Sequence, residues 1–202
     1  MIDFSEQKAR EDNIKSIQLN GRVVSDLIAD AVLQLGENIM IGNFKQRTSN
    51  HDGMFSDYVH GNGKIGVIIE FNALIDAALG KDIAMHIAAM KPKAITSSDV
   101  DPKLIEVEKR VASEKALEAG KTPEIMKKMV DGAVSKFLKE VSLYGQVFVK
   151  SDDNKTTIEH LLKNNQASIN SFTVFTVGEG LEKKSENFAE EVAATTAAAK
   201  VH

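Results

Sequence analysis

The apolar residues of the chain recur at helical spacing in some segments and at every second position in others. In residues 24–35 they lie three or four positions apart, and Gly36 follows where a helix stop is expected. The same spacing continues through residues 77–90, and Pro92 follows shortly after. Both segments are predicted to be amphipathic helices, whereas residues 1–20 are polar and aperiodic and are expected to be a loose arm or the remnant of a preceding segment.

Other segments have the pattern of β-strands. The strongest signal is a hairpin, in which residues 54–60 and 64–71 flank a compact Gly-Asn-Gly turn. Apolar residues occupy every second position of its second strand, which predicts one buried face. Further predicted elements are strands at residues 38–47, 145–150 and 169–177 and a short helix at residues 156–165.

Two longer helices share one kind of beginning. Asp101 precedes Pro102 and Thr122 precedes Pro123, so each helix is expected to start with a capping side chain and a proline at its first position. Gly120 separates the two, which predicts a helical hairpin, and the thin apolar stripe of the first arm indicates that the hairpin projects from the body. The predicted stripes are Leu104, Val107 and Val111 in the first arm and Met126, Met129, Val130, Ala133, Phe137 and Val141 in the second.

Together these elements predict an α+β fold, with a small antiparallel sheet packed with helices, an inserted protruding helical hairpin and a C-terminal helical module. The expected organisation is a polar arm and helix at residues 1–36, an α+β core at residues 37–98 and 141–178, the inserted antiparallel hairpin at residues 99–140 and the C-terminal module at residues 179–202.

Composition and charge narrow the class of protein. Of the 202 residues, 43% are hydrophobic, enough for one sizeable domain or two small ones, while the 5% of aromatic residues predicts a mostly aliphatic core. A formal net charge of −4 argues against direct nucleic-acid binding, and the absence of cysteine excludes disulfides and thiolate chemistry. The chain shows no signal-like apolar stretch and no run approaching the ~18 apolar residues of a membrane span. A soluble cytoplasmic protein without a membrane partner is expected.

The sequence offers few groups for catalysis. Gly178-Glu179-Gly180 lacks both the third glycine of a dinucleotide fingerprint and the Gly-Lys-Ser/Thr of a P-loop, so a tight turn is expected there. The five histidines lack metal-ligand spacing, and no nucleophile motif appears. His86 is expected to be a structural residue, whereas His60 lies at the tip of the predicted hairpin, where an imidazole can face a partner. No enzyme activity, cofactor or metal is expected, although the residues alone leave open an enzyme with perturbed carboxylates.

Four stretches resemble, in the same order, segments of the bacterial elongation factor Ts family, the nucleotide-exchange factors of elongation factor Tu. The most specific stretch is "VGEGLEKKSENFAEEVA", which is similar to the family's C-terminal signature nearly residue for residue. The others are "HGNGKIGVIIE", "GKDIAMHIAAMKP" and "GKTPEIMKKMVDGAVSKFLKEVSLYGQVFVK". The resemblance covers about residues 21–194.

The resemblance implies a guanine-nucleotide exchange factor that binds elongation factor Tu, promotes GDP release and makes no bond itself. It also implies which residues face the partner: His60 in the hairpin, Val149 and Lys150 at the end of a strand, and the C-terminal helix, represented by Leu181, Phe188 and Val192. The helical hairpin is similar to the family's self-association segment, so a homodimer through the hairpin or the core is a further implied state.

The chain departs from the family's pattern in its first part. The family's N-terminal three-helix domain and its Thr-Asp-Phe-Val motif do not occur in this sequence. The chain is therefore similar to the C-terminal two thirds of the family's proteins, with residues 1–36 as the remnant of the N-terminal half of the core. Val147 stands where the family usually has proline, and Val174 where it tends to have arginine. Two roles fit this pattern: exchange on elongation factor Tu, and a docking or dimerisation fragment that binds it without efficient exchange.

Overall fold

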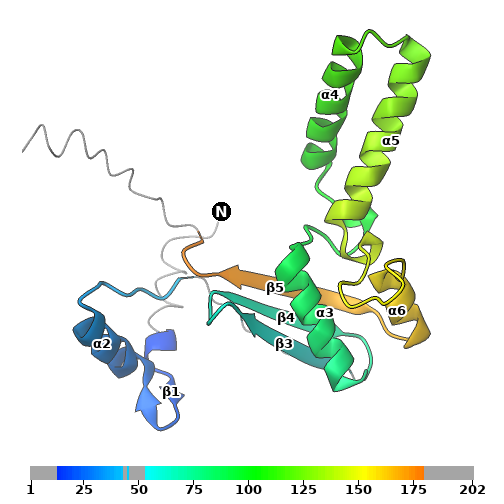
Figure 1. The fold of residues 1–202 in the computed structure, drawn as a ribbon. Helices are drawn as coiled ribbons and strands as arrows, with labels where there is room; N and C mark the ends of the chain where they lie inside the picture. The colour runs from blue at the N-terminus through cyan, green and yellow to red at the C-terminus, as the bar shows by residue number, and fades with distance from the viewer. Residues whose placement is uncertain (1–12, 43–44, 46–52, 180–202) are drawn as a thin grey trace, which may run out of the picture. The chain divides into compact units, whose positions relative to one another are not determined.

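The computed structural model describes residues 13–42, 45 and 53–179, which fall into two compact units, Met1–Thr48 and Ser49–His202. In the first unit β1 (Gln18–Leu19) pairs antiparallel with β2 (Arg22–Val23), and α2 (Val24–Leu35) follows directly (Figure 1). The helix ends at Gly36, which has a φ of 69° and donates its N–H to the Val32 carbonyl at 2.9 Å. The helix predicted over residues 24–35 is confirmed.

Two expectations for the first unit differ from what its described residues show. In residues 13–20, the described part of the arm predicted over residues 1–20, the chain forms β1, because Asn20 and Gly21 adopt positive φ and turn it back on itself. The strand predicted over residues 38–47 is absent from its described part, residues 38–42 and 45. Alternation of only two apolar residues is a weak strand signal, since a strand also needs a neighbour to pair with.

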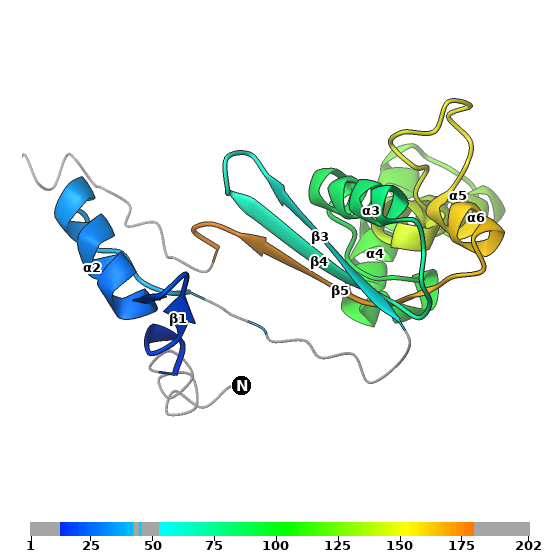
Figure 2. The ribbon, with the colours of Figure 1, turned by 90° about the horizontal axis from the view of Figure 1, so that it is seen from below.

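The second unit is built on a three-stranded antiparallel sheet of order β3-β4-β5. Its strands are β3 (Met54–His60), β4 (Ile65–Phe71) and β5 (Ile169–Thr176), and α3 (Ala77–Met90) lies across one face (Figure 1 and Figure 2). The alternate residues Val67, Ile69 and Phe71 of the central strand are buried against Ile83 and Ile87 of α3. The predicted hairpin and the buried face of its second strand are confirmed.

Helix α3 has a side-chain cap at its start and a residue in the left-handed conformation at its end. Asp76 caps its first turn by accepting the Leu79 N–H at 3.0 Å, and Lys91 ends it in the left-handed conformation with a φ of 48°. The helix comes very close to β3 at Gly80, where a Cβ atom would lie 2.2 Å from Oγ of Ser56. The core therefore depends on a glycine at this contact.

The helical hairpin consists of α4 (Pro102–Glu118) and α5 (Pro123–Val141), which run antiparallel and project from the sheet and α3 (Figure 1). Asp101 caps α4 by accepting the Lys103 N–H at 2.9 Å, as predicted. The expected cap at Thr122 is wrong, because its side chain makes no capping hydrogen bond. Proline at the first position already supplies the required φ, so α5 begins without a side-chain cap.

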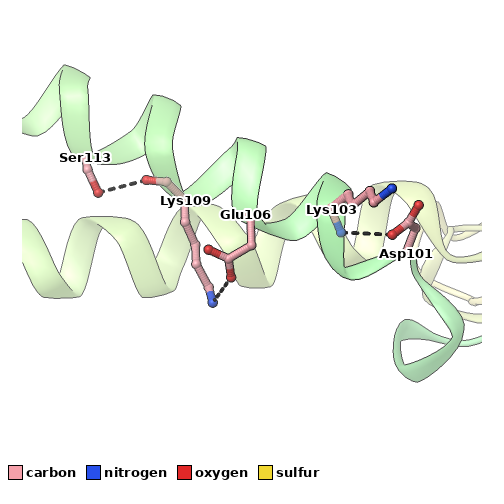
Figure 3. Close-up of polar contacts among 5 residues, drawn as sticks. All are labelled: Asp101, Lys103, Glu106, Lys109 and Ser113. Atoms are coloured by element: carbon pink, nitrogen blue, oxygen red, sulfur yellow. Dashed lines mark hydrogen bonds and ion pairs between the residues drawn. The ribbon is translucent and has the colours of Figure 1, made fainter.

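The exposed side of α4 carries local polar contacts (Figure 3). Lys109 Nζ pairs with Glu106 Oε1 at 2.8 Å, and Ser113 Oγ donates to the Lys109 carbonyl at 2.8 Å. Both contacts join residues one turn apart on the same helix and so act within α4 rather than on its contact with α5. The Glu106–Lys109 pair stabilises the helix by a few tenths of a kcal/mol, roughly, whereas the Ser113 bond to the carbonyl four residues back gives no such gain.

The inner faces of the hairpin differ from the predicted stripes. Leu104 and Val107 of α4 and Met129 of α5 are exposed, whereas Ala112 and Ala116 are the buried residues of α4. Small alanines allow the two helices to approach closely, so the contact ridge lies one position further along α4 than the larger apolar residues indicate.

The remaining elements connect the hairpin to the sheet. The 3-10 helix η1 (Ser97–Asp99) precedes α4, while η2 (Leu143–Gly145) and α6 (Ile158–Asn164) follow α5. Leu143, Ile158 and Leu162 are buried in the same core as the sheet. The α+β fold class is confirmed, and no helix in the described ranges is long and apolar enough to cross a membrane. The predicted C-terminal module lies outside the described residues, apart from Glu179.

Candidate protein-interaction site

His60 is the last residue of β3 and is exposed at the β3–β4 turn. The turn is formed by Gly61, Asn62 and Gly63, whose φ values of 62°, 55° and 89° are left-handed. Nδ1 of His60 lies 3.1 Å from the hydroxyl of Tyr58, which is two residues back and therefore on the same face of the strand. Tyr58 packs against the core and so gives the exposed imidazole a fixed neighbour.

The segment around Val149 and Lys150 is not the strand that the sequence predicts over residues 145–150. Gly145 belongs to η2, and only an isolated bridge joins Val147 to Thr157. The backbone is used instead in local bonds, because the Phe148 N–H donates to the Thr156 carbonyl at 2.9 Å and the Phe148 carbonyl accepts from Ser151 at 3.0 Å. The segment is a folded loop.

His86 of α3 holds this loop from inside. The ring is completely buried, with Nε2 at 3.0 Å from Oε1 of Gln146 and Nδ1 at 3.3 Å from the backbone N–H donor of Val149. Burial lowers the pKa of His86 below its ordinary value, and the hydrogen bond to Gln146 opposes this only in part. The prediction that His86 is a structural residue is confirmed.

An ion pair anchors the next residue of the loop to the same helix. Nζ of Lys150 lies 2.7 Å from Oδ1 of Asp82, which is one helical turn before His86. The Lys150 side chain is 50% exposed, and Val149 is 44% exposed. The loop therefore presents one apolar and one cationic side chain to solvent while its backbone is fastened to α3.

The chain turns sharply just after Lys150, and Asp153 organises this turn. Its carboxylate accepts hydrogen bonds from the Ser151 hydroxyl, from the Thr156 hydroxyl and from the backbone N–H groups of Lys155 and Thr156, the last two at 2.9 Å. These donors hold the pKa of Asp153 well below its ordinary value, the Ser151 hydroxyl most strongly. The hydrogen bonds of this turn therefore persist at every pH at which Asp153 is ionised.

The tight turn predicted at Gly178-Glu179-Gly180 is a closed turn in its described part, residues 178 and 179. Gly178 has a φ of 80°, and the Glu179 N–H donates to the Thr176 carbonyl at 3.0 Å. The carboxylate of Glu179 folds back to accept the Thr176 N–H at 3.3 Å. Because this carboxylate occupies a backbone donor, the turn is unsuited to cradle a phosphate, as the sequence predicted.

The predicted site residues thus fall into three groups. Val149 and Lys150 are held together on α3, whereas within the described residues no hydrogen bond or ion pair links them to His60. Leu181, Phe188 and Val192 lie outside the described residues. The described ranges contain no group of three or more histidine or acidic side chains placed to hold a metal. What the arrangement offers is exposed side chains on supported backbone, which suits protein binding.

Sequence reasoning missed the residues that support these groups: Tyr58, Asp82 and Gln146. Tyr58 had a detectable signal, because a residue two positions from His60 on a strand shares its face. Asp82 and Gln146 had none, since their partners Lys150 and His86 lie 68 and 60 positions away in the sequence.

Comparison with known proteins finds similarity to one protein family over most of the chain. The family model described as "Elongation factor TS" matches residues 3–179. Elongation factor Ts of Burkholderia thailandensis is 50% identical over 188 residues, which are 93% of this chain and 62% of that protein. The same factor of Burkholderia cenocepacia is 49% identical over the same shares, and that of Polynucleobacter necessarius is 47% identical over 91% of this chain and 60% of its own length. The chain thus spans about 62% of the length of the curated relatives it matches.

Proposed function

Because the chain belongs to the elongation factor Ts family, we propose that it binds elongation factor Tu and promotes the release of GDP as a guanine-nucleotide exchange factor. The observation that carries this proposal is the family match over residues 3–179, which includes His60, Val149 and Lys150. As a translation factor of this family it acts in the cytoplasm.

An exchange factor changes an equilibrium and forms no bond. If it binds the nucleotide-free partner more tightly than the GDP-bound partner, linkage requires that its binding weakens GDP binding by the same factor. Coupling of this kind is typically about 1–3 kcal/mol, or roughly 5- to 150-fold in affinity. Such a task needs surface complementarity and a defined backbone, and needs neither a nucleophile nor a cofactor.

The geometry of the loop at Val149 and Lys150 supports a contact role. Exposed Val149 offers apolar area and Lys150 a cation, and both belong to a backbone that α3 already holds. A preformed loop loses less conformational freedom on binding than a mobile one, which favours affinity. The exposed His60 on its supported turn offers a second contact.

The direct test measures release of a fluorescent GDP from elongation factor Tu, with and without the chain, together with a pull-down. Accelerated release together with capture supports the exchange function. Absence of both would reject it.

A charge-swap series then separates the two roles that Lys150 can have. Lys150→Glu places a second carboxylate against Asp82 and is expected to weaken binding to elongation factor Tu, whichever role applies. Adding Asp82→Lys restores the internal pair with its charges exchanged. If Lys150 contacts the partner, the double variant stays weak, whereas recovery of wild-type affinity by titration calorimetry would leave Lys150 only an anchoring role.

A second candidate function is docking on elongation factor Tu, or dimerisation, without efficient exchange. The observation that favours it is the absence of Thr-Asp-Phe-Val from the sequence, in a chain that spans 62% of its relatives' length. Capture of elongation factor Tu without faster GDP release would select this function.

A homodimer is tested separately, by analytical ultracentrifugation of the chain at several concentrations.

A further inference from the structure

His86 has no place among the partner contacts proposed above, yet both of its ring nitrogens are used. It is completely buried, and it joins the side chain of Gln146 to the backbone of Val149, residues that are 60 and 63 positions away in the sequence. A histidine that only filled space would not need a backbone amide as its second neighbour.

The direction of each hydrogen bond follows from one fixed acceptor. The carbonyl of Glu140 can only accept, so Gln146 turns its amide nitrogen toward it at 2.6 Å and its Oε1 toward His86. Because Oε1 also only accepts, Nε2 of His86 carries the proton. In a neutral ring Nδ1 is then a lone-pair acceptor, which is what the N–H of Val149 requires. Burial lowers the pKa of His86, which favours this neutral ring.

We propose that His86 is a positioning residue that fixes Val149 and Lys150 in the conformation in which they meet elongation factor Tu. The proposal rests on the function proposed above. The chain of contacts runs from the end of α5 at Glu140 through Gln146 and His86 to the loop.

Loss of the acceptor has a defined consequence. Without Nδ1, the partly buried Val149 N–H loses its acceptor, and an unpaired donor that water reaches only in part costs part of its desolvation free energy. The loop then loses its backbone contact with α3 at Val149, and the exposed ion pair between Lys150 and Asp82 is the remaining polar contact described between these two loop residues and that helix. Such a pair contributes little. Binding must then order the loop, which lowers affinity.

Two substitutions separate the two ring nitrogens. His86→Asn ends near the position of Nδ1 and keeps an oxygen that can accept the Val149 N–H. His86→Gln reaches toward Nε2, so it can meet Gln146 and leaves Val149 without an acceptor. Ile83→Val removes one buried methyl group from the same helix and is the control for loss of stability.

The experiment measures amide hydrogen exchange at Val149 by NMR and binding to nucleotide-free elongation factor Tu by titration calorimetry, in the full chain. His86→Gln is expected to speed exchange at Val149 and to weaken binding by about 5-fold, the worth of one typical hydrogen bond. His86→Asn and Ile83→Val are expected to leave both values close to those of the unsubstituted chain.

The nitrogen chemical shifts of His86 in the unsubstituted chain provide a test that no folding defect affects. A proton on Nδ1 instead of Nε2 would overturn the proposal, as would unchanged exchange at Val149 in His86→Gln. Faster exchange with unchanged affinity would also overturn it, since the loop conformation would then not matter to the partner. If the unsubstituted chain does not bind elongation factor Tu at all, the proposed function fails, whereas the exchange and chemical-shift arms still report on the positioning of Val149.

Discussion

The close contact between α3 and β3 at Gly80 leads to a sharp prediction for Gly80→Ala. An added Cβ would lie 2.2 Å from Oγ of Ser56 and 3.1 Å from both Cβ of Ser56 and the terminal methyl of Met54. Ser56 is buried in β3, which pairs with β4 and packs against α3, so the Ser56 hydroxyl has to leave its rotamer or the helix and the strand have to separate. The substitution is expected to destabilise the second unit.

The magnitude follows from two opposing effects. Overpacking of a close contact costs typically about 1–3 kcal/mol. Replacing glycine by alanine inside a helix returns about 1 kcal/mol of helix propensity. We therefore expect a net loss of up to roughly 2 kcal/mol in the free energy of unfolding.

The Ser56→Ala background separates these effects. Without Oγ the nearest obstacles to the new Cβ are the two contacts at 3.1 Å, one of which is the flexible end of Met54. In this background Gly80→Ala should therefore be neutral or stabilising by up to about 1 kcal/mol. Urea unfolding followed by far-ultraviolet circular dichroism measures all four proteins of the double-mutant cycle. An equal loss of stability in both backgrounds would refute the steric explanation.

Three further predictions concern pH, capping and the edge of the sheet. Burial holds the pKa of His86 below its ordinary 6.5, so the stability contributed by the neutral ring is fully present above about pH 6.5 and is lost as the pH falls toward the folded-state pKa. In that range the free energy of unfolding falls by at most about 1.4 kcal/mol per pH unit. Urea titrations at several pH values should show a smaller pH dependence for His86→Asn. Asp101→Ala should cost about 1 kcal/mol of unfolding free energy, whereas Thr122→Ala should cost almost nothing, because the Asp101 side chain caps α4 and the Thr122 side chain makes no cap to α5. Equal losses in the two variants would contradict this assignment. Gly53→Ala should destabilise by about 1–3 kcal/mol in the same assay, because its Cβ would lie 2.1 Å from the Phe71 carbonyl oxygen, a backbone atom that cannot rotate away.

Prediction from sequence succeeded where a local pattern carries the information. The helices at residues 24–35 and 77–90 and the strands at residues 54–60 and 65–71 are recognisable from the spacing of their apolar residues and from the glycine, proline or turn that follows them. The structural role of His86 followed from its place among apolar neighbours on a helix. For these helices and strands, the residues that carry the signal are a few positions apart in the sequence, three or four in a helix and two in a strand.

Prediction failed where the deciding neighbour is remote. The segment at residues 145–150 has the composition of a strand, but Thr156 and His86 take its backbone donors and leave a loop. The inner face of α4 follows Ala112 and Ala116 rather than the larger Leu104 and Val107, because close approach to α5 selects small residues.

By itself, the sequence determined the α+β class, most of the elements and, through its resemblance, the family to which the chain belongs. Only the tertiary structure decided how the candidate site is supported. Lys150 finds Asp82 across 68 positions of sequence, and Val149 finds His86 across 63. Short-range periodicity encodes which face of an element is buried. Which polar groups meet depends on how α3, α5 and the loop pack together in the folded chain, because distant segments are brought within hydrogen-bonding range only there.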